Sequence, residues 1–478
     1  MNEKVRRTKI IATLGPASST GESIAKLMDA GVDLFRLNFS HGSNADKAKI
    51  IDLIRALSAK RGKEIGILAD LQGPKIRTGR MENGAIPLRK GDIISITTQE
   101  VLGRPGLIST IYKALPHDVK PGSRILMDDG LIELKVKSVE EGIVNCLVIE
   151  GGILKDLKGI NLPGVKVSSP SLTEKDKTDL EFCLERGVDY IALSFVRRSD
   201  DVESLKRILA ERGLSTPVIA KIEKPEALRN FKSILQVADG IMVARGDLGV
   251  EINAEKVPLI QKQIINACNE VGKPVITATQ MLESMILHPR PTRAETSDVA
   301  NAILDGTDAV MLSGETASGS FPVEAVRTMV KIALDVEGSG LWRMAYSQPP
   351  AGSSAIPVAV AQAACLAAAT VKAKAVVVFT QSGSTAARIA RFRPQLPIIA
   401  FTSSTDIRRR LALYWGVKPL PVGTMDNSDQ QINLVEETLL ESGFRKGDVV
   451  VVTMGVPLGS SGSTNLMKVL KLGAKGEK

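Results

Sequence analysis

Two acidic residues and a lysine stand where they could bind a metal ion together with an anion. Lys221 and Glu223 lie two positions apart at the end of an apolar run, so their side chains share one face if that run is a strand. Asp247 follows the next apolar run. Mg²⁺ binds through one or two carboxylates plus water and substrate oxygens. A lysine beside such a metal suits the charge of a transferring phosphoryl group, and a structural ion pair between Lys221 and Asp247 is the alternative.

More polar residues stand at the ends of other apolar runs. They are Arg36, Asn38, Ser40 and His41, then Asp70, then Arg245 and Gly246 beside Asp247, then Thr279, Ser313 and Glu315. The beginnings of the runs are mostly apolar. Charges that only marked the edge of a core would stand at both ends, so this pattern indicates an active site at one end of a set of strands.

The segment Ala244–Gly249 reads Ala-Arg-Gly-Asp-Leu-Gly directly after an apolar run. Gly246 would let the backbone approach a ligand closely, and exposed amides there could bind a carboxylate or a phosphate. The alternative is a simple turn without a ligand.

The elements that must position these residues alternate between strands and helices. The expected strands are Lys9–Leu14, Asp33–Phe39, Ile65–Ala69, Tyr190–Phe195, Val218–Ile222, Ile241–Ala244, Val275–Ala278 and Ala309–Leu312. Helix-length stretches such as Pro258–Val271 separate most of them, which favours parallel pairing. Eight such units predict an α/β fold of the (β/α)8 TIM barrel type. An open doubly wound sheet is the alternative, although it gives no reason for the count to stop at eight.

Two further regions depart from the barrel pattern. Residues 72–170 hold short β-rich runs, such as Asp92–Thr97 and Leu131–Val136, between Gly and Pro turns, which predicts a small inserted β-barrel domain. An insertion at this end of the barrel would make a lid. After the barrel, which we assign to 1–71 and 171–345, comes a linker at Gly338–Ser354. Residues 346–478 alternate again and predict a C-terminal α/β domain.

The C-terminal elements are expected at specific runs. They are the helices Ala355–Thr370, Ser384–Phe392, Asp406–Tyr414 and Gln430–Ser442, and the strands Ala375–Thr380, Ile398–Thr402 and Asp448–Met454.

Composition excludes several classes of protein. The 478 residues are 44% hydrophobic but only 3% aromatic, so aliphatic side chains must build the core. Four separated cysteines and three histidines disfavour a disulfide framework, a zinc site and a multi-histidine centre. The net charge of +9 fits either a solvated basic surface or attraction of anions, but no basic tract with interleaved aromatics indicates nucleic acid. Without a signal peptide or an apolar span, we expect a cytoplasmic protein that contacts no membrane.

Several motifs together resemble the signature blocks of the pyruvate kinase family. They are Arg36-Leu-Asn-Phe-Ser-His-Gly42, Lys221-Ile-Glu223, Ala244-Arg-Gly-Asp-Leu-Gly249, Ala278-Thr-Gln-Met-Leu-Glu-Ser284, Pro291-Thr-Arg-Ala-Glu295 and Met311-Leu-Ser-Gly-Glu-Thr316. They stand in family order and spacing from about Arg7 to the C-terminus. The resemblance implies transfer of the phosphoryl group of phosphoenolpyruvate to ADP, giving pyruvate and ATP in the last step of glycolysis.

The resemblance also implies residue roles. As catalytic residues it implies Lys221, Arg36 and Thr279, with Lys221 stabilising the transfer and Arg36 gripping the phosphoryl group. For the divalent metal, Mg²⁺ or Mn²⁺, it implies Glu223 and Asp247. For the substrate carboxylate it implies Gly246, Asp247 and Thr279. For the nucleotide, ADP or ATP, it implies Asn38, Phe39, Ser40, His41 and Arg77. The proton donor to the enolate is not evident, and water relayed past Thr279 or Ser313 is our interpretation.

One departure from the family pattern concerns K⁺. In many members the residues at Asn38, Ser40 and Asp70 help to bind K⁺, and Thr and Glu stand where this chain has Leu71 and Lys75. The ammonium of Lys75 near Asp70 would supply that monovalent charge itself. We therefore expect resemblance to a bacterial, potassium-independent branch in which K⁺ is not required. The alternative is an exposed Lys75 without a role.

A second anion site is predicted in the C-terminal domain. The loop after strand Ala375–Thr380 opens a helix and consists of Thr380, Gln381, Ser382, Gly383, Ser384 and Thr385. Hydroxyls and amides at a helix start bind phosphate, although ordinary capping by Ser384 is the alternative. The position resembles the effector site of regulated pyruvate kinases, so we expect an activating sugar phosphate or nucleoside monophosphate such as AMP. The Gly- and Ser-rich loop Val456–Asn465 could close over it.

Two rival functions remain at this point. A barrel lyase or aldolase acting on a pyruvate enolate would use the same metal without ADP, and a non-catalytic sensor of phosphorylated metabolites would need a damaged site. The resemblance implies a homotetramer, which no sequence pattern shows. The sequence leaves open the effector, the preferred nucleotide and the choice between Mg²⁺ and Mn²⁺.

Overall fold

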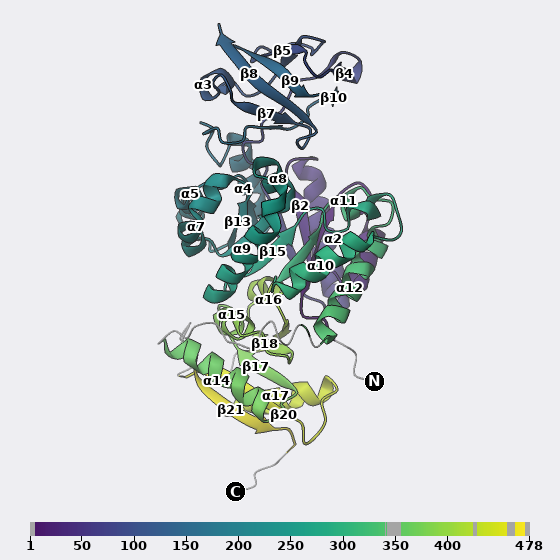
Figure 1. Ribbon diagram of the computed structural model, residues 1–478. Helices are drawn as coiled ribbons and strands as arrows, with labels where there is room; N and C mark the ends of the chain where they lie inside the picture. The colour runs from purple at the N-terminus through teal and green to yellow at the C-terminus, as the bar shows by residue number, and fades with distance from the viewer. Residues whose placement is uncertain (1–4, 340, 342–354, 424–427, 457–463, 474–478) are drawn as a thin grey trace.

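The computed structural model describes residues 5–339, 341, 355–423, 428–456 and 464–473 (Figure 1). Its centre is a closed barrel in which each strand pairs in parallel with its neighbours, in the order β1-β2-β3-β12-β13-β14-β15-β16 and back to β1. The strands are β1 (Lys9–Leu14), β2 (Leu34–Asn38), β3 (Gly66–Asp70), β12 (Tyr190–Leu193), β13 (Val218–Ile222), β14 (Gly240–Ala244), β15 (Val275–Ala278) and β16 (Ala309–Leu312). The predicted (β/α)8 barrel is confirmed, and the open sheet is wrong.

Helices surround the barrel and cover its outer face (Figure 1). They are α1 (Gly21–Ala30), α2 (Asn44–Arg61), α4 (Glu174–Glu185), α5 (Ser199–Glu211), α6 (Pro225–Arg229), α7 (Phe231–Val237), α8 (Arg245–Glu251), α9 (Val257–Val271), α10 (Arg293–Leu304), α11 (Gly314–Ala317) and α12 (Pro322–Gly338). Local sequence sets several starts, because Thr173 and Thr292 each form a capping box with the acidic residue three positions later.

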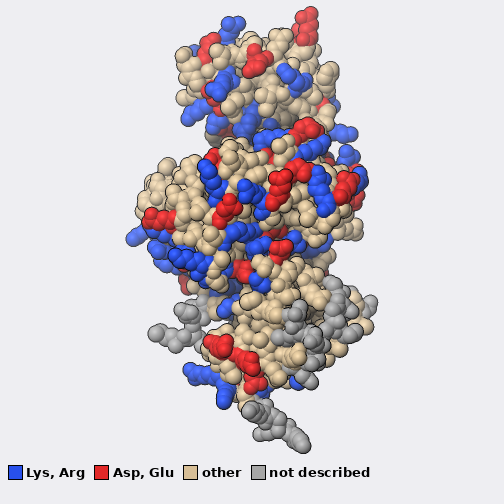
Figure 2. Space-filling model, turned by 180° about the vertical axis from the view of Figure 1, so that it is seen from behind, with Lys and Arg blue, Asp and Glu red and all other residues tan. Residues whose placement is uncertain are grey.

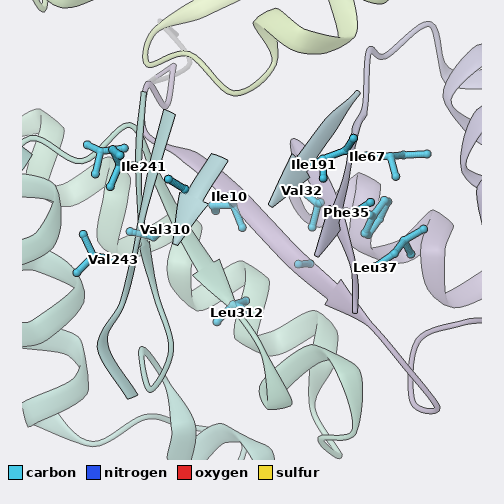
Figure 3. Close-up of a cluster of buried hydrophobic side chains, with 14 of the residues drawn as sticks. Ile10, Val32, Phe35, Leu37, Ile67, Ile191, Ile241, Val243, Val310 and Leu312 are labelled. Atoms are coloured by element: carbon cyan, nitrogen blue, oxygen red, sulfur yellow. The ribbon is translucent and has the colours of Figure 1, made fainter. Parts of the chain in front are cut away.

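Side chains along the barrel strands alternate between two apolar environments. Residues such as Ile10, Phe35 and Ile241 pack outward against the helices, as Figure 3 shows. Their neighbours Ile11 and Leu34 instead join the cluster inside the barrel. Because both faces are buried, the strands are apolar throughout except where polar residues replace the inward positions near their carboxyl ends.

Between β3 and α4 the chain forms the expected inserted β domain, which lies at one end of the molecule (Figure 1). Its strands β11, β7, β8, β9, β5 and β6 make a six-stranded sheet in that order, and β10 and β4 make a separate pair. Their bounds are β4 (Ala85–Leu88), β5 (Ile93–Thr97), β6 (Leu107–Ser109), β7 (Arg124–Met127), β8 (Ile132–Glu140), β9 (Ile143–Glu150), β10 (Gly152–Lys155) and β11 (Ile160–Asn161), with the short helix α3 (Leu115–Asp118). The insertion has its own apolar core.

The C-terminal region forms a five-stranded sheet in the order β19-β18-β17-β20-β21, in which only β21 is antiparallel. Its strands are β17 (Ala375–Phe379), β18 (Ile398–Thr402), β19 (Val417–Pro421), β20 (Val449–Gly455) and β21 (Thr464–Lys471), with helices α14 (Ile356–Thr370), α15 (Ser384–Arg391), α16 (Thr405–Leu411) and α17 (Ser428–Glu441). The predicted elements are confirmed with shifted ends, but both edge strands were missed. β19 holds two prolines, which a strand tolerates at a sheet edge. Most of the predicted linker lies outside the described residues.

The C-terminal region closes the floor of the barrel, opposite the insertion (Figure 1). Leu413 is fully buried among the side chains inside the barrel. Arg393 forms an ion pair of 2.8 Å with Asp308, and both side chains are nearly inaccessible to solvent. The floor is therefore sealed, and the carboxyl ends of the strands remain as the open mouth.

The surface carries charges of both signs, and the cysteines are unbridged. Acidic and basic side chains are interspersed over the barrel on the face in Figure 2. All four cysteines are free thiols. Among the helices of the described residues, none has the length and apolarity to cross a membrane.

Candidate active site

The inward positions at the carboxyl ends of β2, β3 and β13 bring together a network of charges. The Asp70 carboxylate lies 2.7 Å from Arg36 Nε and 3.1 Å from Lys221 Nζ. Lys221 Nζ also lies 2.9 Å from Glu223 Oε1. All four side chains are at least 88% buried, since the most exposed of them, Arg36, reaches 12%. Lys221 is thus paired with Asp70 and Glu223, and the predicted alternative of a Lys221–Asp247 pair is wrong.

The ionisation of this network follows from burial and charge pairing. Burial alone would raise the pKa of Asp70, but the Lys221 and Arg36 cations outweigh it and hold that pKa below its ordinary value. Burial would likewise lower the pKa of Lys221, but Asp70 and Glu223 raise it well above its usual range. The site therefore holds a permanent ammonium group at the barrel mouth.

Glu223 and Asp247 line the same cavity and form a pair of carboxylates suited to a divalent metal. Burial raises the pKa of Glu223, and the nearby charge of Asp247 acts in the same direction although Lys221 opposes it. Glu223 Oε2 accepts a hydrogen bond of 2.8 Å from the Phe195 amide.

Few groups of the protein compete for these two carboxylates or could join them as metal ligands. Across the described part of the chain, nothing donates to the Asp247 carboxylate, and no cluster of three or more metal-ligating side chains occurs. Two carboxylates, one of them unpaired, fit Mg²⁺, which takes few protein ligands and keeps water and substrate oxygens.

A cavity of about 110 Å³ opens beside this network. It is lined by Arg36, Asn38, Ser40, His41, Asp70, Leu71, Gln72, Lys75, Arg77, Ser194, Phe195, Lys221, Glu223 and Asp247. Most residues predicted to bind the substrate, the nucleotide, the divalent metal or K⁺ therefore line one small polar cavity.

Gly246 and Thr279 lie beside the cavity without lining it. The Gly246 amide donates to Thr279 Oγ1 at 2.7 Å, which joins the ends of β14 and β15. Thr279 has φ of 70°, an unfavourable conformation for a β-branched residue. The Arg245 guanidinium stabilises it by donating to the Thr279 carbonyl at 2.8 Å, while pairing with Asp298 at 2.6 Å. Strain of this kind is typical of functional sites.

Two lysines donate hydrogen bonds to backbone carbonyls of the predicted nucleotide-binding segment. Lys47 Nζ donates to the His41 carbonyl, and Lys175 Nζ donates to the Phe39 carbonyl at 2.7 Å. The Phe39 side chain is only 1% exposed and packs in the barrel core, so it is not available to contact a nucleotide. Burial and the charges of Arg77 and Lys75 lower the pKa of His41, which keeps its imidazole neutral near pH 7.

Sequence reasoning missed Ser194, Thr13 and Phe195. Ser194 Oγ accepts from Lys221 Nζ at 2.7 Å, and Thr13 Oγ1 accepts from Arg36 Nη1 at 3.0 Å. Both residues follow the rule used for the other strands, because they lie near the carboxyl ends of β12 and β1. Reading all eight strand ends in the same way would have found them.

Lys75 and Asp70 line the same cavity. Both oxygens of Asp70 are engaged by Arg36 and Lys221, and no ion pair joins it to Lys75 among the residues with described positions. The structure thus brings the two groups near each other without pairing them.

The predicted effector loop precedes α15. Gly383, with φ of 85°, occupies the N-cap position, and the helix start has no side-chain cap. Capping by Ser384 is therefore wrong, and its hydroxyl instead accepts from Arg388 Nη1 at 3.1 Å. Thr385 Oγ1 lies 2.7 Å from Thr464 Oγ1. Residues 457–463 of the late loop lie outside the described residues, so its closure stays a prediction.

Comparison with known proteins covers nearly the whole chain. Residues 5–326 match the family described as "Pyruvate kinase, barrel domain", and residues 358–470 match "Pyruvate kinase, alpha/beta domain".

Individual relatives agree with these family matches. A pyruvate kinase of Geobacillus stearothermophilus is 50% identical over 469 residues, covering 97% of this chain and 80% of the relative. Pyruvate kinase 2 of Synechocystis sp. is 49% identical over 469 residues, covering 97% and 79%. The crystal structure of a pyruvate kinase from Cryptosporidium parvum superposes with a TM-score of 0.91 at 40% identity, covering 98% of this chain and 96% of that one.

A barrel mouth that holds an ammonium, a guanidinium and two carboxylates thus occurs in a chain that matches one enzyme family over nearly its whole length. This chain belongs to the pyruvate kinase family and transfers the phosphoryl group of phosphoenolpyruvate to ADP, forming pyruvate and ATP in glycolysis.

Proposed function

We propose that Lys221 and Arg36 are the cations that stabilise the transferring phosphoryl group. The supporting observation is that Asp70 bonds to both of them and so aims them into one cavity. Phosphoryl transfer gains most from fixed charges placed where negative charge develops. The bond from phosphorus to the enol oxygen breaks as a bond to a terminal phosphate oxygen of ADP forms. The enolate then takes a proton at its methylene carbon, by water relayed past Thr279 or Ser313.

The divalent metal, Mg²⁺ or Mn²⁺, would be held by Glu223 and Asp247. When bound it would supply Lewis-acid stabilisation of oxygen charge. Gly246, Asp247 and Thr279 would orient the substrate carboxylate, since the Gly246–Thr279 hydrogen bond fixes the two strand ends beside the metal ligands. Asn38, Ser40, His41 and Arg77, with the Phe39 backbone, would contact the nucleotide.

A coupled assay separates this reaction from its rivals. ATP should form only when phosphoenolpyruvate, ADP and a divalent metal are all present. A lyase or aldolase would consume its substrate without ADP, and a sensor would bind phosphoenolpyruvate without turnover. Asp247→Asn should raise the metal concentration needed for half-maximal rate at least tenfold, and an unchanged requirement would remove Asp247 from the metal site.

We also propose that the enzyme does not require K⁺. The Lys75 ammonium lies in the same cavity as Asn38, Ser40 and Asp70, where it contributes a fixed positive charge. Activity should be nearly equal in potassium chloride and in tetramethylammonium chloride of the same ionic strength. Lys75→Glu should make activity dependent on K⁺. A large loss in tetramethylammonium with the unaltered enzyme would contradict the proposal.

The loop Thr380–Thr385 is proposed as the site of a phosphorylated activator, either a sugar phosphate or AMP. The exposed hydroxyl of Ser382, the partly exposed hydroxyl of Ser384, the helix start without a side-chain cap and Arg388 beside Ser384 are suited to a phosphate. A panel of sugar phosphates and AMP should reveal one compound that lowers KM for phosphoenolpyruvate. The double variant Ser382→Asp and Ser384→Asp should lose this activation because it adds negative charge, and unchanged activation would exclude the loop.

The remaining proposals concern organisation. We propose a homotetramer in the cytoplasm, with a barrel at 1–71 and 171–345, a lid at 72–170 and a regulatory domain at 346–478. Light scattering after size exclusion would measure the assembly, and a monomeric mass with full activity would contradict it. Limited proteolysis should cut first near the proposed boundaries.

A further inference from the structure

A buried ion pair lies at the junction between the insertion and the barrel. Lys224 Nζ contacts Glu251 Oε1, and the two side chains are 13% and 2% exposed. The same carboxylate oxygen accepts a hydrogen bond of 2.9 Å from Asn161 Nδ2. Asn161 belongs to β11 of the insertion, whereas Glu251 ends α8 of the barrel. This pair therefore reaches the insertion through a charge-assisted hydrogen bond.

A second contact joins the insertion to the same helix. The turn between β7 and β8 holds Asp128, Asp129 and Gly130, all with positive φ. A methyl group placed on Gly130 would lie 3.6 Å from Val250, so this turn packs on the last turn of α8. The end of α8 is thus one of the surfaces on which the insertion rests, and the Val167 carbonyl, which accepts from Arg197 at 2.6 Å, marks another.

Both members of the ion pair lie close in sequence to the proposed metal ligands. Lys224 directly follows Glu223, and Glu251 stands four residues after Asp247 on the short helix α8. Lys224 Nζ also lies 5.6 Å from the centre of the Phe195 ring, and the Phe195 amide donates to Glu223. These contacts and the short backbone segments give the insertion a direct physical route to both carboxylates.

We propose that Lys224 and Glu251 are positioning residues. Through the hydrogen bond from Asn161, they fix the position of the insertion relative to the two proposed metal ligands. The inference rests on the roles proposed above for Glu223 and Asp247. The physical reason is that a buried carboxylate must keep its ionic partner and its donor, so the insertion cannot move away without leaving that charge unsatisfied.

The test uses Asn161→Ala, Glu251→Gln and Lys224→Met in the full chain, with Asp305→Asn as the matched control. Asp305 is also a buried carboxylate, 6% exposed, that pairs with a lysine, but it lies at the end of α10 next to the barrel floor. Asn161→Ala leaves the ion pair intact and so keeps the test valid if the other two variants fold poorly.

Amide hydrogen exchange without ligands is the first readout. Exchange over 125–132 and 160–162 should become about tenfold faster in Asn161→Ala and Glu251→Gln, and stay unchanged in Asp305→Asn. The KM for phosphoenolpyruvate should rise about tenfold, with kcat changing less than threefold. The exchange of the double variant Lys224→Glu with Glu251→Lys should return toward the value of the unaltered chain.

Unchanged exchange in Asn161→Ala would overturn the proposal even if kinetics changed, because the pair would then act on the active site alone. Faster exchange together with unchanged KM would overturn the link to the metal ligands. In both cases ATP formation would continue, so this failure is distinct from a failure of the proposed function.

Discussion

Asp70 organises the active site because it pairs with two cations, Arg36 on the adjacent strand β2 and Lys221 on β13, two strands away. Its oxygens lie 2.7 Å from Arg36 and 3.1 Å from Lys221, and its own carboxylate is almost wholly buried. In water these side chains would sample many rotamers. Pairing removes that freedom before the substrate arrives, so little reorganisation remains for the transfer step.

Replacing Lys221 with methionine should therefore lower kcat by about 10²–10³ while changing KM for phosphoenolpyruvate much less, since a fixed transition-state charge is lost. Steady-state kinetics at saturating ADP would measure both constants. Lys262→Met is the control, because Lys262 is half exposed and pairs with Asp305. A kcat within tenfold of the unaltered enzyme would contradict the assigned role.

At the scale of elements, β1 is attached to the C-terminal sheet by a buried lysine. Lys9 Nζ donates to the carbonyl of Val417 in β19 at 2.7 Å. Burial lowers the pKa of Lys9 to about 8, although Asp33 and Glu337 oppose the shift. Because the folded pKa is depressed for a base, the folded state releases this proton at a lower pH than the unfolded chain does.

The contribution of Lys9 to stability should therefore rise with pH. Between about 8 and the ordinary pKa of 10.5, the unfolded chain binds the proton that the folded chain has lost. Relative to Lys9→Met, the free energy of unfolding should increase by about 3 kcal/mol between pH 7.5 and 10.5, at about 1.4 kcal/mol per pH unit. Urea unfolding across this range would measure it, and parallel curves for the two proteins would contradict it.

In the whole molecule, the C-terminal region seals the barrel floor, and the insertion lies at the opposite end (Figure 1). Leu413 and Ala412 pack among the inward side chains of the barrel strands, and Tyr190 Oη donates to the Arg410 carbonyl at 2.7 Å. The interior of the barrel is thus completed by residues far away in sequence, which couples the stability of the two regions.

Leu413→Ala should lower the free energy of unfolding by about 2–5 kcal/mol, since it leaves a cavity inside the barrel. Leu366→Ala on α14 is the control, because that side chain is 69% exposed. Denaturant unfolding of both variants would decide. A loss below about 1 kcal/mol for Leu413→Ala would show that the floor collapses around the cavity.

The sequence by itself determined the barrel strands and most of the residues at its mouth. Short apolar runs separated by helix-length stretches are local patterns, and in a parallel barrel all carboxyl ends must meet at one rim. That rule was enough to bring Arg36, Asp70, Lys221 and Glu223 together. The motif blocks added the reaction, because their order and spacing are specific to one family.

Only the tertiary structure decided how those groups pair. Lys221 pairs with Asp70 and Glu223 and not with Asp247, because the directions of the side chains on the strands set the distances between these charged groups. The edge strands, Leu413 in the floor and the contact from Asn161 to Glu251 likewise join segments distant in sequence. Such contacts depend on how separate elements pack, and no periodicity within one segment encodes them.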